Sequence, residues 1–287
     1  MTDQYAVIGN PIAHSKSPLI HAAFAREVGH DISYSRMLVP INQFRAAVDE
    51  FRHKGALGAN VTLPFKFEAF EYATQLTDRA RASGAVNVLR FGRLDDGQIS
   101  TEILGDNTDG IGLTRDITQN LGMALQGARI LLIGAGGAAY GVAGALLDES
   151  PASLTITNRT DAKAQALATT LVTSTSKYFG STVMAISVDK LSHQAFDVII
   201  NATSASMTDT SDNQASLVPA TCFAQGSLAY DMMYGKAQTA FLQLAAQSGA
   251  RTADGVGMLV EQAAEAFFVW RGVKVKTAPL ISSLKQG

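Results

Sequence analysis

A glycine-rich turn between an apolar strand and a helix constrains the fold of this chain more than any other feature. Residues 130–133 are apolar, and Gly134-Ala135-Gly136-Gly137-Ala138-Ala139 follows them directly. The first glycine permits a tight turn, the second lets a pyrophosphate approach the backbone, and the small Ala139 lets helix and strand pack closely. Free N–H groups at the helix start would hold the phosphates. The motif predicts a dinucleotide site formed by Gly134, Ala135, Gly136, Gly137 and Ala138, with a turn that only packs as the alternative.

The residues around this turn alternate between strands and helices. Strands are expected over residues 128–133, 154–157, 183–187, 198–201 and 228–231, with a helix ending near residue 148 and another over residues 162–171. Apolar strands separated by helices indicate a parallel sheet that is covered on both faces. The pattern predicts a doubly wound Rossmann domain over residues 108–251, which opens with a helix over residues 108–121.

The first hundred residues have a different pattern, typical of a mixed α/β unit. Strands are expected over residues 5–8, 33–39, 59–63, 85–91 and 99–104, and helices over residues 18–27, 44–54, 67–76 and 78–83. Asp95-Asp96-Gly97 separates the last two strands and favours a β-hairpin there. A helix over residues 259–270 is expected to pack back on this unit. The fold class is therefore a two-domain α/β protein, with a mixed-sheet substrate domain over residues 1–107 plus 252–287.

Composition excludes several classes of protein. With 287 residues, 47% of them hydrophobic, the chain can bury two cores and is not disordered in bulk. Its 23 Lys+Arg against 25 Asp+Glu make nucleic acid an unlikely partner. The lone Cys222 excludes an internal disulfide and a Cys-rich metal site, and His14 and His21 lack a third ligand nearby, so no metal is expected. Without a signal peptide or a membrane span, the expected location is the cytoplasm.

The strand expected at residues 154–157 ends in Asn158, Arg159 and Thr160. An NAD enzyme usually carries an acidic residue here that bonds the ribose 2′-hydroxyl, whereas a guanidinium holds a 2′-phosphate. Lys163, one helical turn beyond, adds positive charge. These residues predict NADP as the cofactor, while Asp161 is the residue that would favour NAD and a solvated loop cation is the alternative role for Arg159.

Further motifs follow in order along the chain. They are GNPIAHSKSP at residues 9–18, GANVTLPFK at 58–66, GAVN at 84–87, DNTDG at 106–110, NRT at 158–160, NATS at 201–204, YDMMY at 230–234, and DGVGML at 254–259 with Gln262. Together with the glycine turn, they resemble the shikimate dehydrogenase family over nearly the whole chain. The resemblance implies NADPH-dependent reduction of 3-dehydroshikimate to shikimate in aromatic amino-acid biosynthesis.

The resemblance also implies roles for individual residues. Lys66 and Asp109 would handle the proton at the reacting oxygen, and which of the two donates it stays open because a coupled pair titrates as a unit. Substrate contacts are expected from Ser15, Ser17, Asn60, Thr62, Asn87, Tyr234 and Gln262. Thr203, Met232 and Gly255 are expected beside the cofactor.

Each of these assignments has a structural alternative. Ser15 and Ser17 could cap the helix that begins near Pro18, and Asn and Thr residues often serve turns and caps. Two departures from the family pattern stand out: Ala205-Ser206-Met207 replaces the usual glycine after the NATS motif, and Lys163 stands where a second arginine is common.

Rival functions at this point are a dual quinate/shikimate or paralogous ring-acid dehydrogenase, and a non-catalytic NADP-sensing regulatory protein. The expected partner is a small-molecule substrate. The sequence leaves open whether the protein is a monomer or a homodimer.

Overall fold

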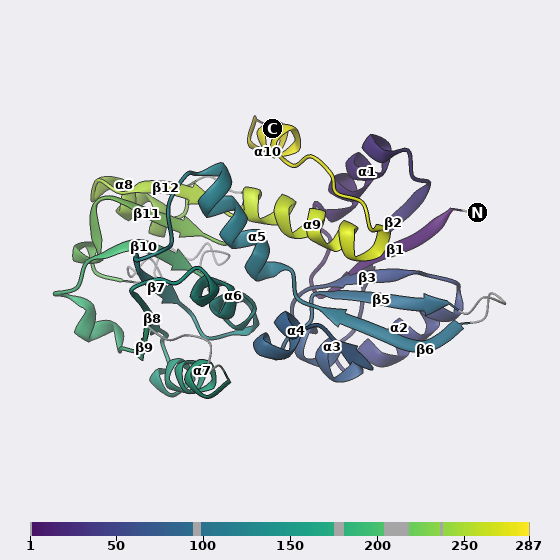
Figure 1. Cartoon of the computed structure of the whole chain (residues 1–287), viewed down its shortest axis with the longest axis horizontal. Coiled ribbons are helices and arrows are strands. Elements are labelled where there is room, and N and C mark those ends of the chain that lie inside the picture. Colours follow the sequence, from purple (N-terminus) through teal and green to yellow (C-terminus); the bar gives the residue numbers. More distant parts are fainter. Residues whose placement is uncertain (1, 94–98, 175–180, 204–217, 236–237, 287) are drawn as a thin grey trace. The chain divides into compact units, whose positions relative to one another are not determined.

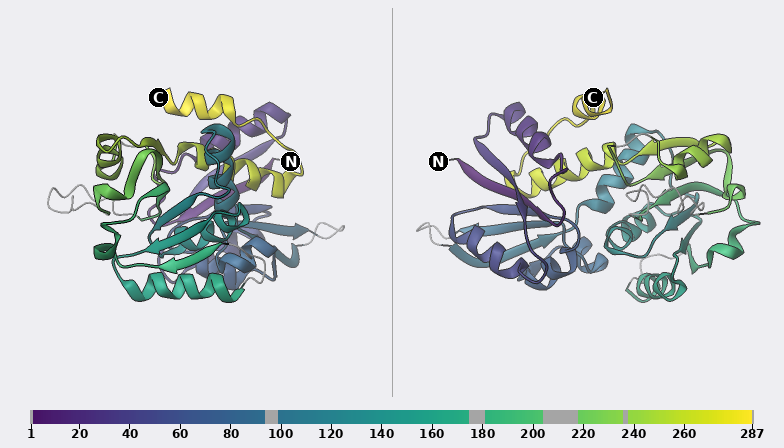
Figure 2. Two further views of the ribbon diagram at one scale, coloured as in Figure 1. Left: turned by 60° about the vertical axis from the view of Figure 1, so that its left-hand side comes forward. Right: turned by 180° about the vertical axis from the view of Figure 1, so that it is seen from behind.

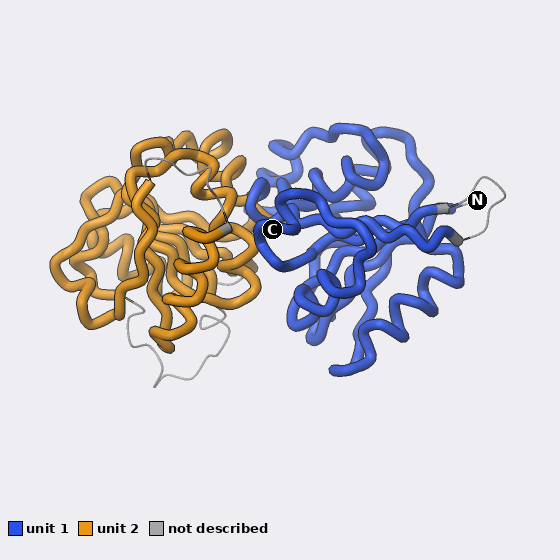
Figure 3. The backbone as a smooth tube through the Cα atoms, turned by 60° about the horizontal axis from the view of Figure 1, so that its bottom comes forward, with its two compact units in different colours: residues 1–112, 260–287 blue, residues 113–259 orange. Residues whose placement is uncertain are grey.

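The chain divides into two compact units (Figure 3), and each unit contains one six-stranded sheet. The computed structural model describes residues 2–93, 99–174, 181–203, 218–235 and 238–286. Residues 1–112 with 260–287 make up the first unit, and residues 113–259 make up the second. The boundary falls within α5 (Asp109–Arg115) and α9 (Val256–Arg271), so both helices contribute residues to each unit.

The sheet of the first unit is mixed, as the sequence predicts. Its strands lie in the order β2-β1-β3-β5-β6-β4, in which β1 pairs in parallel with β2 and β3, β5 pairs antiparallel with β3 and β6, and β4 pairs in parallel with β6. The bounds are β1 (Asp3–Gly9), β2 (Ile32–Leu38), β3 (Gly58–Val61), β4 (Gln75–Leu76), β5 (Val88–Arg93) and β6 (Ile99–Asp106). The predicted hairpin is confirmed by the β5–β6 pairing, while its turn lies outside the described residues.

Helices cover both faces of this sheet (Figure 1). Buried side chains of α2 (Phe44–His53), α3 (Lys66–Tyr72) and α4 (Asp78–Ser83) pack with apolar residues of β1, β3, β5 and β6 on one face. On the other face, α1 (Ser17–Val28) meets α9 through aromatic contacts such as Phe24 with Phe267, and Trp270 packs on Tyr5 of β1. The prediction that the helix near residues 259–270 packs on the first unit is confirmed from Val260 onward.

Helix α3 is shorter than predicted. The expected helix over residues 67–76 ends at Tyr72, because Ala73 is extended and the Thr74 N–H donates to the Ile103 carbonyl at 3.0 Å. Gln75 and Leu76 then pair with β6 as a short strand. A helical pattern of apolar residues does not show this exit, since the bonds that end the helix come from a strand nearly thirty residues further along the chain.

The sheet of the second unit is parallel throughout, with strands in the order β12-β11-β10-β7-β8-β9. Figure 2 shows the ribbon of this unit from two further sides. Its elements are β7 (Arg129–Ile133), α6 (Gly137–Asp148), β8 (Ser153–Thr157), α7 (Asp161–Ser174), β9 (Thr182–Ala185), β10 (Phe196–Asn201), β11 (Phe223–Asp231), α8 (Ala240–Gln247) and β12 (Arg251–Asp254). Residues of α6 and α7 pack on one face and residues of α8 on the other. The strand order reverses between β7 and β10, as in a doubly wound Rossmann sheet, so the predicted fold class is confirmed.

Three elements of the second unit differ from the prediction. The sequence pattern misses α8 and the edge strand β12, in which only Ala253 is buried. The expected single helix over residues 108–121 is α5 followed by a π-helical turn, Asp116–Asn120. The buried Asp116 carboxylate accepts one hydrogen bond from Asn120 within that turn and another from Tyr230 of β11.

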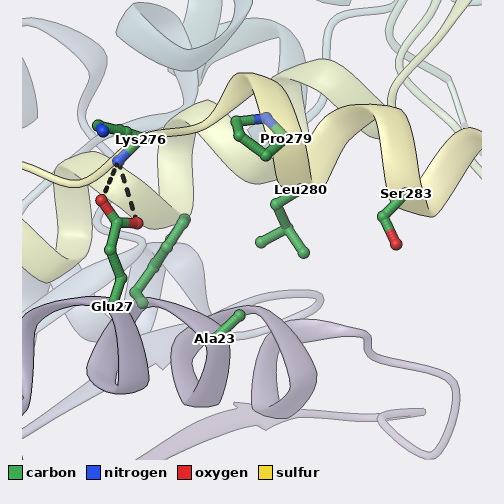
Figure 4. A pocket seen from close by; sticks show the side chains of 7 residues that line it. Ala23, Glu27, Lys276, Pro279, Leu280 and Ser283 are labelled. Atoms are coloured by element: carbon green, nitrogen blue, oxygen red, sulfur yellow. Dashed lines mark hydrogen bonds between the residues drawn. The ribbon is translucent and has the colours of Figure 1, made fainter.

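The C-terminal helix α10 (Ala278–Gln286) lies beside α1 (Figure 4). The Lys276 backbone N–H donates to both oxygens of Glu27, and a cavity of about 440 Å³ opens between the two helices. Its lining does not include any residue that the sequence assigns to substrate or cofactor. Among the described residues, no helix is long and apolar enough to cross a membrane.

Candidate active site

Lys66 and Asp109 form an ion pair in the first unit. Lys66 is the first residue of α3 and Asp109 is the first residue of α5, and the Lys66 Nζ donates to the Asp109 Oδ2 at 2.5 Å. Their side chains are only 13% and 4% exposed. Because little water screens them, the two charges interact strongly and hold each other in place. The two residues predicted to handle the proton are therefore in direct contact.

Asn87 connects this pair to a further predicted residue. Its Nδ2 donates to the Asp109 Oδ1 at 2.8 Å and to the Gln262 Oε1 at 3.3 Å, while its Oδ1 accepts from the Thr108 N–H at 2.8 Å. Asn87 is buried and stands just before β5. Both oxygens of Asp109 are thus engaged, one by an ammonium and one by an amide, so the carboxylate is held against rotation.

Asn60 and Thr62 lie at the carboxyl end of β3, beside the end of β1. The Asn60 Oδ1 accepts from the Tyr34 hydroxyl at 2.6 Å, and its Nδ2 donates to the Asn87 carbonyl at 3.3 Å. The Thr62 N–H donates to the Ile8 carbonyl at 2.9 Å. Asn60 is thereby joined through Asn87 to the Lys66–Asp109 pair.

Ser15 and Ser17 lie together before and at the start of α1. The Ser15 hydroxyl donates to the Ser17 Oγ at 3.1 Å and accepts from the Ser17 N–H at 3.3 Å. Arg36 of β2 donates twice to the Ser15 carbonyl, at 2.9 and 2.6 Å. The N-cap residue of α1 is Lys16, whose side chain makes no capping hydrogen bond. The alternative that these serines cap the helix is therefore supported only by the hydrogen bond from the Ser17 N–H to the Ser15 Oγ.

Tyr34 is a residue of this site that the sequence analysis misses. Its hydroxyl contacts Asn60, and burial raises the pKa of its phenol well above the ordinary value, although the nearby Ser17 hydroxyl lowers it somewhat. Its ring stacks on His21, with the centroids 4.4 Å apart and the planes at 9°. Nothing local in the sequence marks Tyr34, because its partners are 13 or more residues away.

A second missed group anchors the loop that carries Asp109. Arg79 donates to both oxygens of Asp106 and, at 2.9 Å, to Glu265 of α9. Burial raises the pKa of Asp106, but the Arg79 guanidinium and the Thr77 hydroxyl outweigh this and hold it below its ordinary value. A charged Asp106 therefore ties the end of β6 to α4 and α9 three residues before Asp109.

The glycine turn lies at the strand-order reversal of the second unit. Gly134 has a φ of +113°, and a Cβ there would lie 3.1 Å from the Thr203 Cγ2, so both its conformation and its surroundings require glycine. Gly136 has an ordinary extended backbone, and a Cβ there would meet no atom of the described residues within 4 Å. Ala139 is fully buried.

This arrangement fits a pyrophosphate at the start of α6. None of the described residues has an atom in the space beside Gly136, and its position as N-cap leaves the first N–H groups of α6 without a side-chain cap. Gly137 and Ala138, the first residues of that helix, are partly exposed, while Ala135 is buried. Open backbone amides at a helix N-terminus favour an anion.

The residues after β8 are open to solvent. The Asn158 side chain donates to the Thr160 carbonyl at 3.0 Å, which shapes the turn into α7. Arg159, Thr160 and Lys163 are exposed, and so is Asp161, the residue that would favour NAD. The predicted cations are thus placed on the surface after the second strand of this sheet, where they are available to a ligand.

The loops after β10, β11 and β12 meet at the same edge of the sheet. The Thr203 hydroxyl donates to the Asn201 Oδ1 at 2.7 Å, and the buried Asp231 carboxylate accepts from the Asn201 Nδ2 at 3.2 Å. A Cβ on Gly255 would overlap the Met232 carbonyl, so glycine is required there. Gly134, Thr203, Met232 and Gly255 are therefore brought to one edge.

Three further features named in the sequence analysis lie outside these groups of residues. Tyr234 is partly buried and belongs to the second unit, unlike the other predicted substrate residues. Ala205-Ser206-Met207 lies outside the described residues. Cys222 is buried, and burial raises the pKa of its thiol to about 11, so little of it is thiolate near pH 7.

Family models match the chain in three successive segments. The model described as the shikimate dehydrogenase substrate binding domain matches residues 7–89, the shikimate / quinate 5-dehydrogenase model matches residues 116–221, and the shikimate 5'-dehydrogenase C-terminal domain matches residues 255–285. A protein of Nitrosospira multiformis named shikimate dehydrogenase (NADP(+)) is 52% identical over 286 residues, which cover 99% of this chain and 98% of the relative. The chain belongs to the shikimate dehydrogenase family. The resemblance seen in the motifs is thereby confirmed.

Other members of the shikimate dehydrogenase family agree with this assignment. A protein of Dechloromonas aromatica with the same name is 54% identical over 287 residues, covering 99% of this chain and 98% of the relative. Among solved structures, the shikimate 5-dehydrogenase of Thermus thermophilus in complex with NADP(H) and shikimate has a TM-score of 0.83 and 29% identity, and the match covers 99% of each chain.

Proposed function

We propose that this chain catalyses the NADPH-dependent, reversible reduction of 3-dehydroshikimate to shikimate in aromatic amino-acid biosynthesis. The observation that carries the proposal is the shielded Lys66–Asp109 pair, joined by Asn87 to Gln262 and Asn60. The relatives named shikimate dehydrogenase (NADP(+)) support the same activity and the same cofactor. The protein is accordingly an NADP-dependent oxidoreductase that acts on a CH–OH group.

Ketone reduction needs a hydride at the carbonyl carbon and a proton at the carbonyl oxygen. NADPH supplies the hydride when it is bound. The oxygen gains negative charge as the carbon is reduced, and the Lys66 ammonium stabilises that charge. The Lys66–Asp109 pair delivers the proton that converts the oxygen into the product hydroxyl, and Asp109 orients the ammonium for this step. In the reverse direction, the pair accepts the same proton.

The first unit supplies most of the substrate contacts in this proposal. Ser15 and Ser17 bind the carboxylate through hydroxyl and backbone donors. The side chains of Asn60, Thr62, Asn87 and Gln262 bind the ring hydroxyls, each of which would cost roughly 1 to 3 kcal/mol if buried without a partner. Tyr234 keeps its predicted role as a substrate contact. The first unit is therefore the substrate domain.

The second unit is the NADP domain in this proposal. The glycine turn would hold the pyrophosphate, because among the described residues Gly136 leaves open space before the first N–H groups of α6. Arg159, together with Asn158, Thr160 and Lys163, receives the 2′-phosphate, because a guanidinium forms paired, charge-assisted bonds with phosphate. Thr203, Met232 and Gly255 line the nicotinamide end.

An assay of product and cofactor tests the proposed function. The protein is mixed with NADPH and 3-dehydroshikimate, the absorbance of the reduced cofactor is followed, and shikimate is identified by chromatography. Shikimate formed in equal amount to NADPH consumed is expected. Parallel reactions oxidise shikimate or quinate with NADP or NAD. Binding of NADPH without turnover of any acid would contradict the proposal and favour the regulatory alternative, and quinate turnover equal to that of shikimate would broaden the substrate class.

A further inference from the structure

The amide of Asn60 has a defined orientation in the first unit. Its Nδ2 lies 3.3 Å from the Asn87 backbone carbonyl, which can only accept a hydrogen bond, so the NH₂ group must face Asn87. The Oδ1 then faces the Tyr34 hydroxyl at 2.6 Å, and that hydroxyl must donate. These two contacts together fix the orientation of the Asn60 amide.

Tyr34 is well placed to hold this orientation. Tyr34 lies opposite Tyr5 across β2 and β1, and Tyr5 lies opposite Gly58 of β3. Because Asn60 is two residues beyond Gly58, its side chain stands on the same face of the sheet as that of Tyr34. The tyrosine therefore reaches Asn60 across the intervening strand β1.

Aromatic neighbours keep the Tyr34 ring in place. The buried His21 ring stacks on it, and the Trp270 ring lies 6.3 Å away between centroids. The Trp270 Nε1 donates in turn to the Leu89 carbonyl of β5 at 3.0 Å. Burial lowers the pKa of His21 to about 3, while Asn60 opposes this shift, so the ring is neutral near pH 7. A neutral, stacked ring is a support whose charge does not change during catalysis.

We propose that Tyr34 is a positioning residue, which fixes the Asn60 amide so that Asn60 meets a substrate hydroxyl with N–H and not with its oxygen. One N–H of the amide is directed to Asn87, and the other is the donor offered to the ring hydroxyl. This inference rests on the proposed function. It assigns to Tyr34 a part in substrate binding that neither the motifs nor the family comparison gives it.

The test is the variant Tyr34→Phe, which removes the hydroxyl and keeps the ring that stacks on His21. Losing the donor removes the 2.6 Å contact to the Asn60 Oδ1 and loosens the orientation of the amide, so the KM for 3-dehydroshikimate should rise about tenfold. The KM for NADPH and kcat should stay within about twofold of the parent, because the bound substrate and the transition state lose the same contact and the cofactor loses none. An unchanged KM for 3-dehydroshikimate would overturn the inference.

Tyr72→Phe is the matched control. The Tyr72 hydroxyl also donates to a side-chain oxygen, the Asp49 Oδ1, and its ring is also packed among aromatic residues, but it lies on the opposite face of the sheet. This variant loses a comparable hydrogen bond and should keep the parent's KM. Thermal unfolding of both variants shows whether either effect comes from instability.

A double-mutant cycle with Asn60→Ala separates positioning from a general structural effect. If Tyr34 acts through Asn60, then Tyr34→Phe adds no further rise in KM once the amide is gone. Equal fold-changes in the presence and absence of the amide would contradict the inference. The cycle is measured on a parent that already reduces 3-dehydroshikimate, so an inactive parent refutes the proposed function and not the role of Tyr34.

Discussion

The Lys66 ammonium and the Asp109 carboxylate are 2.5 Å apart, and Asn87 holds the second oxygen of that carboxylate at 2.8 Å. The carboxylate therefore has two fixed partners and one orientation. Thr108 supports the arrangement, since its N–H is bound by the same Asn87 side chain. For the proposed catalytic pair, this fixed geometry would lower the cost of reaching the transition state.

Removing Asn87 should weaken catalysis and stability together. In Asn87→Ala, Asp109 loses its amide partner and the buried Thr108 N–H is left unpaired, so the free energy of unfolding should fall by about 1 to 3 kcal/mol. The turnover number should fall by at least tenfold, because the misplaced pair delivers the proton less well. Urea unfolding and steady-state kinetics on folded protein measure the two effects. Parent-like kcat in this variant would show that Asn87 does not hold the pair.

Arg159 should decide the choice between the two cofactors. A charge-assisted hydrogen bond contributes roughly 1.5 to 3 kcal/mol, so Arg159→Ala should raise the KM for NADPH by about 10- to 100-fold and leave the KM for NADH nearly unchanged. Arg129→Ala is the control, because Arg129 is a half-exposed arginine of the same unit, paired with Asp197 at the amino end of β7. An equal loss of affinity for both cofactors would argue against a 2′-phosphate contact.

Replacing Gly134 and replacing Gly136 should have different effects on stability and on cofactor binding. Gly136→Ala has room for its methyl group and an ordinary backbone, so the free energy of unfolding should change by less than about 0.5 kcal/mol, whereas NADPH binding should weaken at least about tenfold. Gly134→Ala forces an alanine into a left-handed conformation, which costs of order 1 to 3 kcal/mol, in addition to its contact with Thr203. Denaturation measures the stability of each variant, and NADPH titration measures its affinity for the cofactor. A stable Gly136→Ala protein with parent affinity would place the pyrophosphate elsewhere.

His21 should make the protein less stable in mild acid. Burial lowers its pKa from 6.5 to about 3, and neither ring nitrogen makes a well-formed hydrogen bond among the described residues. At a pH below 6.5, the pKa of His21 in the unfolded chain, the unfolded chain binds a proton that the folded chain does not. The contribution of the neutral His21 to the free energy of unfolding is therefore fully present above that pKa, and it is lost as the pH falls toward 3.

The size of this effect follows from the shift. Between about pH 7.5 and about pH 5.5, His21 should account for a loss of about 1.4 kcal/mol in the free energy of unfolding. His21→Phe keeps an aromatic ring against Tyr34 and cannot titrate. The free energy of unfolding of this variant should therefore fall by about 1.4 kcal/mol less than that of the parent between these two pH values. Urea unfolding at both pH values checks this, and identical pH dependence in parent and variant would contradict it.

Much of the fold could be predicted from the sequence because its signals are local. The apolar runs of β7 and β10 reflect burial on both faces of a parallel sheet, and the glycine turn is one contiguous motif. The edge strand β12 carries no such run, since it is covered by fewer neighbours. The end of α3 and the π-helical turn at Asp116 depend on bonds from distant segments, which periodicity does not report.

The candidate site also contains some residues that the sequence indicates and others that it does not. Lys66, Asp109 and Asn87 stand in short motifs whose residue types suit the chemistry, so the sequence indicates them before any geometry is known. Tyr34 and Arg79 carry no motif. Tyr34 acts on a residue 26 positions away, and Arg79 joins partners 27 and 186 positions away, so only the folded chain shows what they hold.

The most direct test of the account is the turnover of Lys66→Met on 3-dehydroshikimate with NADPH, measured beside the variant's affinity for shikimate. Lys54→Met, which removes an exposed lysine paired with Glu50, serves as the control. The account predicts that Lys66→Met still folds and binds shikimate while its kcat falls by about 10²- to 10⁴-fold, and that the control keeps parent activity. A Lys66→Met protein with the kcat of the parent would contradict the assignment of the Lys66–Asp109 pair as the proton-transfer centre.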